Sequence, residues 1–473
     1  MRPTLPLLLV GWALLHTCAA WAAGGTAHAV TTTADSGAGS LREAINAANS
    51  TPTSDVIGFD AALNGQTIYP LTQLPALVDG GTVIDGDIDN NGDPDIGLDG
   101  SQQSSGDGLT FLPHSDGLGC RALGLSVGRF PRYGIYLAGS HLNTIQTCHV
   151  GVSLGGAALR TNAHADLYLH QSHDNVIGGD TFAESNIFAG GNGLVSSTAG
   201  VYIFEGNNNQ IQRNSFGLTR SGTAALGTGR EGVIIRNGTG NVVGGGGAAK
   251  RSVFGGLKTG ISVYFGAHSN SVTGCYVGTT ADGYTSLPLT YGVILGADAH
   301  DNTVGGTTAA ARNIFGGGPD ALGVYVLNTG SVDNLICGNY FGLGPNGTTQ
   351  IDIEDGVYVG SDAGSQTVGG PTEAHGNHFR CPDMGVIVRV GGAGSVIRRN
   401  RFGWRADGTA ATGVSNARAI EVTDVRVTVS QCSIRGHDVG LRTTGSANPI
   451  VTKTTFANCA RCVDIQSPSN PNL

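Results

Sequence analysis

A triplet of the form Asn-x-(Ile/Val) recurs along most of the chain, and this repeat limits the possible folds more than any other feature. Successive triplets lie 29 to 34 residues apart. They begin at Asn143, Asn175, Asn209, Asn241, Asn270, Asn302 and Asn334, and Gln366 and Ser395 continue the series. A period of this size predicts an array of stacked structural units. Such an array is a scaffold, so we expect any functional site to lie on its loops.

Two further columns of residues recur with the same period. One reads (Asn/Cys/Ser)-x-(Phe/Val)-Gly and begins at Cys148, Asn186, Asn214, Ser252, Cys275, Asn313, Asn339, Asn377 and Asn400. The other reads Gly-Val-x-(Ile/Val), with glycines at 134, 200, 232, 260, 292, 323, 356 and 385. Each repeat therefore carries three short β-branched or aromatic runs separated by turn residues. The repeats alternate, because extra residues follow the Phe-Gly in one type (219–227, 405–413) and precede it in the other (305–312).

Three short strands in each repeat, with no helix between them, predict an all-β fold. We expect a right-handed, single-stranded parallel β-helix of about ten coils, a solenoid with three strands per coil. Coils in such a fold stack about 4.8 Å apart, so the same residue type stacks on itself. Asn suits these positions because its amide can form ladders and its backbone tolerates the left-handed conformation. Leucine-rich repeats and propellers are less favoured, because no L-x-x-L-x-L frame and no recurring Trp-Asp is present.

Composition is consistent with one long solenoid. Gly makes up 78 of the 473 residues, and only 13% of the residues are charged. A hydrophobic content of 40% can form a thin core along a solenoid. The net charge of −9 argues against nucleic acid or an anionic membrane as the main partner.

The N-terminal segment suggests export. Residues 1–22 resemble a secretory signal peptide, with Arg2, an apolar run at 5–15 and the small-x-small site Ala20-Trp21-Ala22. The apolar run is too short to span a membrane, and no later segment could span one. We therefore expect a secreted or cell-surface protein with a cap and first coils at 23–110, β-helix repeats at 111–465 and a loose tail at 466–473.

A short helix should cover the first coil, because the open end of a solenoid exposes strand edges. Residues 40–48 form the strongest helical pattern of the chain, with Ser40 and Glu43 as a capping box. Its apolar stripe consists of Leu41, Ala44, Ile45 and Ala48. The first strands are expected at 56–59, 67–69 and 83–84.

The segment 32–45, which contains Ser-Leu-Arg-Glu-Ala, resembles a known N-terminal motif. It is similar to the Cys-Ser-Leu-Arg-Glu-Ala segment of bacterial secreted and surface β-helix repeat proteins of the pectin-lyase-like superfamily, with Gly39 in place of the Cys. The Asn-x-(Ile/Val)-Gly-Gly-Thr and Asn-x-Phe-Gly phrases extend the similarity over residues 30–465. The resemblance implies a parallel β-helix and export. It implies no particular activity, because the superfamily includes lyases, hydrolases, epimerases and adhesins.

Eight cysteines follow the expected signal peptide, an even number that suggests disulfides in an exported protein. Cys148 and Cys275, however, lie four coils apart in one column, about 19 Å at β-helix spacing. A disulfide needs Cα atoms within about 7 Å. We therefore predict that these two and Cys432 are buried ladder members that replace Asn. A Cys459–Cys462 bridge could close a small loop, and the pairing of Cys381 stays open.

The acidic segment 85–95 predicts a calcium site. Asp87, Asp89, Asn91, Asp93 and Asp95 reproduce the first half of an EF-hand-type loop, whose alternating oxygens surround Ca²⁺. Leu98 stands where a bidentate Glu is expected, although Asp99 could replace it. The role would be structural, fastening the cap. The alternative is a solvated acidic loop without an ion.

Evidence for catalysis is weaker. A glycosidase needs two carboxylates about 5 to 10 Å apart, and Asp352, Glu354, Asp355 and Glu231 are the candidates. A lyase needs a basic residue, and two basic clusters are present: Lys250, Arg251 and Lys258, and then Arg398, Arg399, Arg401 and Arg405. His164, His170 and His173 form a weak metal candidate. Turn acids and surface solubility explain these groups more simply.

The sequence therefore favours an exported β-helix scaffold that presents loops for surface adhesion or carbohydrate contact, with a polysaccharide or cell-surface glycan as partner. Its support is the regularity of the repeats and the lack of signatures of known β-helix enzymes. The alternative is a polysaccharide lyase or glycoside hydrolase of the pectin-lyase-like group. We assign no catalytic residues from the sequence.

Overall fold

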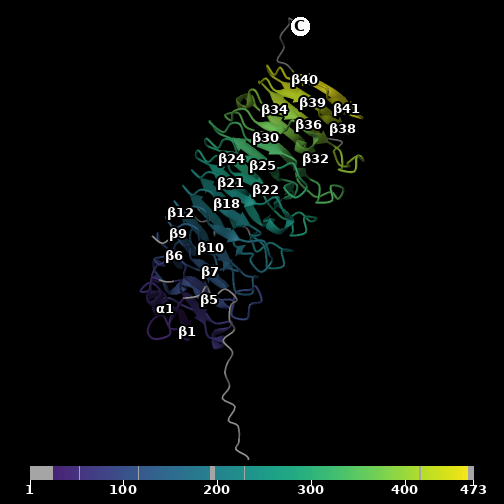
Figure 1. The fold of residues 1–473 in the computed structure, drawn as a ribbon. Coiled ribbons are helices and arrows are strands. Elements are labelled where there is room, and N and C mark those ends of the chain that lie inside the picture. Colours follow the sequence, from purple (N-terminus) through teal and green to yellow (C-terminus); the bar gives the residue numbers. More distant parts are fainter. Residues whose placement is uncertain are drawn as a thin grey trace, which may run out of the picture.

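The chain forms one elongated solenoid of about 13 turns, built from three parallel sheets (Figure 1). The structure, a computed structural model, describes residues 25–52, 54–114, 117–191, 198–227, 229–414 and 417–466. The expected signal peptide and the tail from residue 467 lie outside the described residues. The right-handed parallel β-helix is confirmed. It has more turns than the ten expected, because the coils before Asn143 and after Ser395 lack the Asn triplet.

Each coil contributes one strand to each sheet, and all neighbouring strands run parallel. Sheet A contains β1 (Ala27–Val30), β2 (Val56–Phe59), β4 (Val83–Asp85), β7 (Arg121–Leu123), β10 (Thr144–Gln146), β13 (Val176–Gly178), β16 (Gln210–Gln212), β19 (Val242–Gly244), β22 (Ser271–Thr273), β25 (Thr303–Gly305), β28 (Leu335–Cys337), β31 (Thr367–Gly369), β34 (Val396–Arg398), β37 (Thr428–Ser430) and β40 (Ile450–Thr452). Sheet B contains β3 (Thr67–Ile68), β5 (Ile96–Asp99), β8 (Leu125–Gly128), β11 (His149–Val150), β14 (Ile187–Phe188), β17 (Ser215–Phe216), β20 (Val253–Phe254), β23 (Tyr276–Val277), β26 (Ile314–Phe315), β29 (Tyr340–Phe341), β32 (His378–Phe379), β35 (Arg401–Phe402), β38 (Ser433–Arg435) and β41 (Thr455–Ala457). Sheet C contains β6 (Leu109–Phe111), β9 (Ile135–Ala138), β12 (Leu167–His170), β15 (Val201–Phe204), β18 (Gly229–Arg236), β21 (Leu257–Tyr264), β24 (Tyr291–Gly296), β27 (Leu322–Leu327), β30 (Asp355–Val359), β33 (Met384–Val388), β36 (Arg418–Thr423), β39 (Val439–Thr444) and β42 (Arg461–Gln466).

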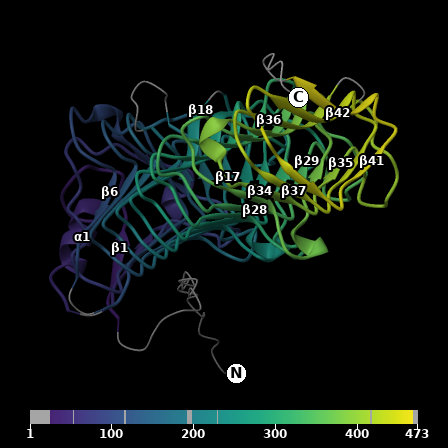
Figure 2. The same ribbon diagram turned by 90° about the horizontal axis from the view of Figure 1, so that it is seen from above.

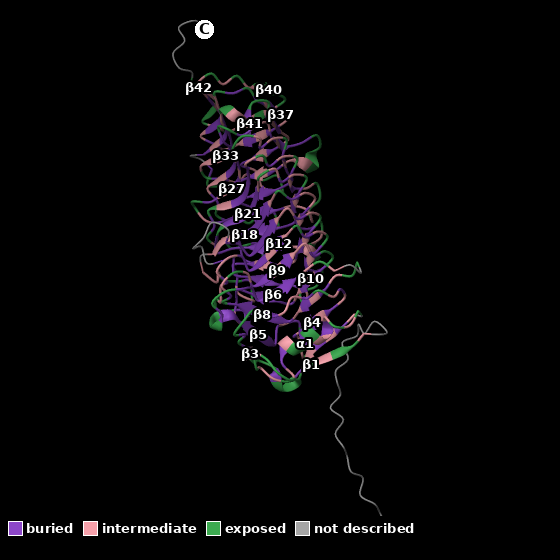
Figure 3. Ribbon diagram, turned by 90° about the vertical axis from the view of Figure 1, so that its left-hand side faces the viewer, coloured by how far each residue is buried: buried purple, intermediate pink, exposed green. Residues whose placement is uncertain are grey.

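The core runs along the axis of the solenoid, where buried residues line the inside of all three sheets (Figure 3). Phenylalanines of sheet B stack face to face inside it. The centroids of Phe216 and Phe254 lie 4.6 Å apart, and those of Phe341 and Phe379 lie 4.7 Å apart. Stacking of identical residues in successive coils explains why the Phe-Gly pattern recurs in the sequence.

The Asn-x-(Ile/Val) triplets form the predicted ladder. The Oδ1 atom of Asn175 accepts both the backbone N–H and the side-chain N–H of Asn143, each at 2.9 Å. The same pair of bonds links the following members of the ladder as far as Asn334 and Gln366. Because a buried amide without a partner is costly, each Asn depends on its neighbours in the adjacent coils.

Cysteines occupy ladder positions, as predicted for Cys148, Cys275 and Cys432. The backbone N–H of Cys148 donates to Asn186 Oδ1, and that of Cys275 donates to Asn313 Oδ1. Burial raises the pKa of both thiols to about 12. Cys459 and Cys462 form no disulfide, so the bridge considered for them is absent, and Cys381 is likewise unbridged.

The N-terminal end is closed by α1 (Leu41–Ala48), and the other end of the solenoid carries β42 (Figure 2). The expected apolar stripe of α1 is buried, and Ser40 Oγ accepts from the backbone N–H of Glu43. In turn, the Glu43 carboxylate accepts a hydrogen bond from the backbone N–H of Gly39. Strand β1, which precedes the helix, was not predicted.

The short 3₁₀ segments are η1 (Ala61–Leu63), η2 (Gly100–Gln102), η3 (Ala248–Lys250), η4 (Glu373–His375) and η5 (Val390–Gly392). Among the described residues, no helix is long and apolar enough to cross a membrane.

The extra residues that follow Phe-Gly form β-hairpins over the outer face of sheet B. Antiparallel bridges join Val152 with Leu159, Leu218 with Ala225, Thr279 with Ser286, Leu343 with Gln350 and Trp404 with Ala410. We call these five hairpins the hairpin column. Neighbouring hairpins share hydrogen bonds, such as that from the N–H of Arg220 to the carbonyl of Gly156. They cover a second small core that includes Tyr276 and Tyr340.

Candidate functional site

The outer face of sheet C carries one register position that changes character along the solenoid. A register position here means the residues that pair across successive parallel strands. This one runs through Tyr136, Tyr168, Tyr202, Ile234, Ser262, Ile294, Tyr325, Tyr358, Ile387, Glu421, Arg442 and Asp464. It begins with aromatic residues and ends with charged ones, although the inward-facing positions of the same strands stay apolar.

The first part of this face is an aromatic stretch, formed by Tyr133, Tyr136, Tyr168, His170, Tyr202 and Phe204. The rings of Tyr136 and Tyr168 stack with centroids 5.4 Å apart, and Tyr133 lies 4.5 Å from Tyr168. Most of these side chains are half-buried, so part of each is accessible to solvent. Burial raises the pKa of the Tyr136 and Tyr168 hydroxyls, which therefore remain hydrogen-bond donors at neutral pH.

Two arginines border the aromatic stretch. The guanidinium of Arg132 lies 5.0 Å from the ring centroid of Tyr133 and pairs with Asp107 at 3.3 Å. The guanidinium of Arg236 lies 5.4 Å from the ring centroid of Phe204, a member of the stretch, and 4.1 Å from that of Phe265. Cations over aromatic rings hold both groups in place while leaving N–H donors available.

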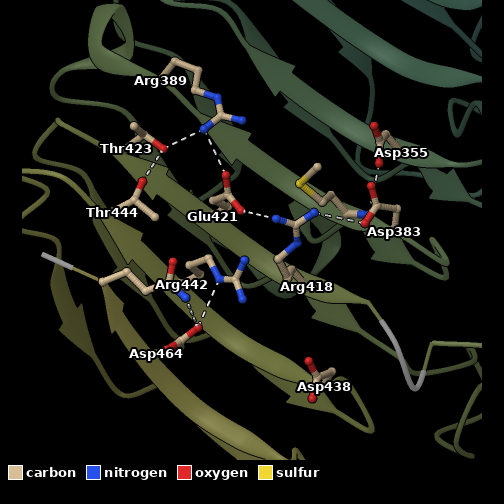
Figure 4. A network of polar contacts seen from close by, with 12 residues as sticks. Asp355, Asp383, Arg389, Arg418, Glu421, Thr423, Asp438, Arg442, Thr444 and Asp464 are labelled. Atoms are coloured by element: carbon tan, nitrogen blue, oxygen red, sulfur yellow. Dashed lines mark hydrogen bonds and ion pairs between the residues drawn. The ribbon is translucent and has the colours of Figure 1, made fainter. Parts of the chain in front are cut away.

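The far end of the same face is a charged stretch, shown in Figure 4. Glu421 lies at its centre: its Oε1 accepts from Arg389 at 2.9 Å and its Oε2 from Arg418 at 2.6 Å. Arg418 also reaches Asp383 at 3.1 Å, and Arg442 pairs with Asp464 at 3.1 Å. Each guanidinium thus has a carboxylate partner, which indicates a self-satisfied structural network.

Asp355 begins this network and has an unusual proton affinity. Burial, together with the nearby carboxylates of Asp383 and Glu354, raises the pKa of Asp355 to about 7. The N–H of Met384 donates to its Oδ1 at 3.0 Å. A carboxyl group that holds a proton near neutral pH, beside other carboxyl groups, is an arrangement that acid–base catalysis uses.

The other predicted carboxylates do not join Asp355 in one catalytic pair. Glu231 occupies the same register position as Asp355, but four strands away, which is about 19 Å at sheet spacing. Burial raises the pKa of Glu231. The backbone carbonyl of Asp352 accepts from Ser286, which fastens the hairpin column. The structure therefore unites only Glu354 and Asp355 of the predicted set.

The first predicted basic cluster separates, whereas two members of the second lie together at one pocket. Lys250 ends η3 and lies 3.6 Å from Asp180, while Arg251 lies over the ring of Tyr276. Lys258 is exposed on β21. Arg399 and Arg401 border a pocket on sheet B, which is treated below.

The predicted histidine cluster is divided between two environments. His170 belongs to the aromatic stretch, with its ring centroid 5.9 Å from that of Tyr168, and His164 packs against the stretch, 5.7 Å from Tyr133. His173 instead stacks on His141 at 4.8 Å. In the described parts of the chain, the only group of three or more ligating side chains close enough to share a metal ion is Asp87, Asp89 and Asp95.

The acidic loop places these three carboxylates within 4.8 Å of one another, measured between ligand atoms. Burial and the charges of Asp85 and Asp95 raise the pKa of Asp87, although backbone N–H groups of Gly92 and Asn91 oppose the shift. Asn91 donates to Asp89 at 2.9 Å. A set of carboxylate and amide oxygens of this kind fits Ca²⁺, which prefers hard oxygen ligands.

Asp93, the remaining predicted ligand, directs its carboxylate away from this group. Its Oδ1 lies 2.5 Å from Nε of Arg220, which also donates to the carbonyl of Gly92 at 2.9 Å. Asp93 is the seventh residue counted from Asp87, a position that contributes its backbone carbonyl in EF-hand loops. Arg220 belongs to the second hairpin of the column, so it fastens the acidic loop to the repeats.

The aromatic stretch was missed in the sequence because its members are far apart in the chain. A signal was present: Tyr136, Tyr168 and Tyr202 occupy the same position in three successive coils, although Asp166 replaces the motif glycine in the second of them. Ion pairs such as Arg389 with Glu421 left no such periodic signal.

Comparison with known proteins finds similarity of overall fold only. No protein-family model and no curated protein matches the chain. Solved structures that resemble it include the surface adhesin PfbA of Streptococcus pneumoniae, with 12% identity, 89% of this chain and 88% of that chain covered, and a TM-score of 0.37. Pectate lyase Pel9A has 13% identity, covers 83% of this chain and 82% of that chain, and has a TM-score of 0.35. Similarity at this level carries no argument about activity. The chain is a parallel β-helix by its own sheets, and its function must be inferred from its own side chains.

Proposed function

We propose that this chain is an exported, non-catalytic β-helix that binds a glycan along the outer face of sheet C, with the aromatic stretch as the contact surface. The observation that carries the proposal is the row of half-buried tyrosines at one register position, bordered by Arg132 and Arg236. Sugars combine apolar C–H faces with hydroxyl groups. Aromatic edges with hydroxyls and arginine N–H donors complement both features.

The rigidity of the scaffold favours this use. Neighbouring side chains of one register position repeat about every 4.8 Å along a straight sheet. The Tyr136 hydroxyl lies 3.3 Å from Nδ1 of His170, and ring stacking restricts the rotamers further. Binding to side chains that are already ordered loses less conformational entropy.

A panel of immobilised neutral and acidic polysaccharides tests the proposal. We expect binding to at least one of them, and we expect Tyr168→Ala to weaken it about tenfold or more. Tyr325→Ala is the matched control, because Tyr325 occupies the same register position outside the aromatic stretch. Equal loss in both variants, or no binding across the panel, would contradict the assignment.

A second candidate is hydrolysis or lyase chemistry at the charged stretch, favoured by the raised pKa of Asp355. The same panel is incubated with the protein while reducing ends and unsaturated products are measured. Products formed by the chain but not by Asp355→Asn would establish the enzyme. Their absence would favour the binding scaffold.

We also propose that the acidic loop binds Ca²⁺ through Asp87, Asp89, Asn91 and Asp95, with Asp93 contributing to the loop. Support comes from the spacing of the ligands and from the approach of three carboxylates. A bound ion stabilises the folded state by mass action. Chelation should therefore lower the melting temperature by a few degrees. Asp89→Asn should abolish the response, whereas Asp362→Asn, an exposed acid elsewhere, should retain it; an unchanged melt of the parent would exclude a structural ion.

A further inference from the structure

The last member of the hairpin column borders a pocket that has a tryptophan in its wall. In the first four hairpins, the residue that follows Phe-Gly or Val-Gly is fully buried, at Val152, Leu218, Thr279 and Leu343. In the fifth hairpin this residue is Trp404, which is only half-buried. Its indole ring therefore forms part of an accessible wall.

This pocket has a volume of about 230 Å³ and lies over β35 and β38 on the outer face of sheet B. Its walls are Glu373, Arg399, Asn400, Arg401, Trp404, Gly408, Gln431 and Ser433. Arg435, on the strand next to β35, places its guanidinium 4.8 Å from the ring centroid of Trp404. The pocket thus combines a flat apolar wall with the guanidinium groups of Arg399 and Arg401, and Arg435 lies beside it over the ring of Trp404.

The positive charges of the pocket exceed its negative charges. Glu373 pairs with Arg399, and Asp407 beside the pocket is held by the amide and hydroxyl of Thr409. Among the described residues, no carboxylate pairs with Arg401 or Arg435. In a chain with a net charge of −9, this excess is a local feature.

A histidine and two buried N–H donors beside the pocket are consistent with a site for an anion. Burial and the charges of Arg401 and Arg312 lower the pKa of His378 to about 4, so this neighbour stays neutral. The Nε1 atom of Trp404 and the Nε atom of Arg399 are buried donors with no acceptor among the described residues. Buried N–H groups are nearly always paired in folded proteins.

We propose that this pocket binds an oxyanion carried on a sugar-sized ring, with the ring against Trp404 and the oxyanion between Arg401 and Arg435. Guanidinium groups form strong, directional hydrogen bonds to sulfate and carboxylate oxygens. The site lies on a different sheet from the aromatic stretch, so it does not depend on glycan binding there.

Tryptophan fluorescence can follow this site directly. The chain has three tryptophans, Trp12, Trp21 and Trp404, and subtracting the signal of Trp404→Phe isolates the one in the pocket. The probes are glucose 6-sulfate and glucuronate, with glucose as the neutral control and inorganic sulfate as the ringless one. We expect a saturable change with the sulfated sugar, the uronate or both, a weaker effect of sulfate and none with glucose. Which of the first two binds more tightly identifies the oxyanion.

Variants connect the response to the two arginines. Arg401→Gln and Arg435→Gln should each weaken binding about tenfold or more, because each removes charge-assisted hydrogen bonds. Arg401→Lys retains the charge and should weaken binding less. Arg426→Gln is the control, since Arg426 is exposed on the same coil as Arg435 but at another corner. Melting curves show whether each variant is folded. No Trp404 response to either charged sugar, an equal response to glucose, or unchanged binding in both Gln variants would overturn the proposal.

Discussion

The two ends of the outer face of sheet C show how one register position can serve different purposes. At β12 the residue is Tyr168, which stacks between other tyrosines, and at β36 it is Glu421, which binds two arginines. The backbone register is the same at both places. The fold therefore fixes where a side chain points, and the residue there decides whether the surface can offer contacts to a ligand or satisfies itself. The aromatic stretch leaves donors and apolar edges available, whereas the charged stretch uses its groups internally.

Removing the centre of the charged stretch should have the largest effect. Glu421→Ala leaves Arg389 and Arg418 without their shared partner. The effect should be large because the Glu421 side chain is only 6% exposed. Breaking a largely buried pair in this way costs about 3 to 4 kcal/mol. Denaturant unfolding measures the loss. A loss below about 1 kcal/mol would mean that the network is a set of ordinary surface pairs.

A buried carboxyl below the aromatic stretch should cause the next largest effect. Asp166 stands in the Gly column beneath Tyr168, and burial raises its pKa to about 7 despite hydrogen bonds from Asn162 and Gly190. Because the folded pKa exceeds the unfolded value, the free energy of unfolding should fall as pH rises from about 4 to about 7. Asp166→Asn should remove that fall, on the order of 3 to 4 kcal/mol. A pH profile of stability identical to the parent would contradict this.

The cause of the raised pKa should differ between the two stretches. Burial raises the pKa of both groups, but Asp355 also has the carboxylates of Asp383 and Glu354 beside it, whereas the groups around Asp166 are neutral hydrogen-bond donors that oppose the shift. Asp383→Asn should therefore lower the pKa of Asp355 by about one unit, equivalent to roughly 1.4 kcal/mol. It should leave Asp166 unchanged. NMR titration of the two carboxyl groups distinguishes these outcomes, and a shift of both or of neither would refute the distinction.

Salt should have a smaller effect, weakening the ion pairs of the charged stretch but not the ring contacts of the aromatic stretch. Ion pairs at the surface are screened, whereas ring stacking is not. Pairs such as Arg461 with Asp438, with side chains 47% and 39% exposed, should weaken most. In equilibrium unfolding, Tyr168→Phe should change the free energy of unfolding by the same amount at 0.05 M and at 0.5 M salt. The small loss caused by Asp438→Asn at 0.05 M salt should disappear at 0.5 M. A salt-dependent Tyr168 variant would contradict the comparison.

Much of the fold could be predicted from the sequence because the interior repeats. Asn143 must bond Asn175 and Phe216 must stack on Phe254, so selection for a satisfied, filled core leaves a period in the chain. The capping helix was predictable for the same reason, since Ser40 and Leu41 follow local rules. The outer face has no such requirement. Arg389 meets Glu421 across 32 residues through one pair alone, and Trp404 stands in a position where the other hairpins have Val, Leu or Thr, with no motif that marks a pocket, so neither could be assigned before the structure was known.

Hydroxyl-radical footprinting of the protein bound to its glycan tests the central claim most directly. Oxidation of exposed aromatic side chains reports which of them a ligand covers. Our account predicts that Tyr136, Tyr168 and Phe204 lose reactivity on binding, while Tyr325 and Tyr358 on the same outer face keep theirs. Protection of the second group, or unchanged reactivity of all five while binding is measured, would contradict it.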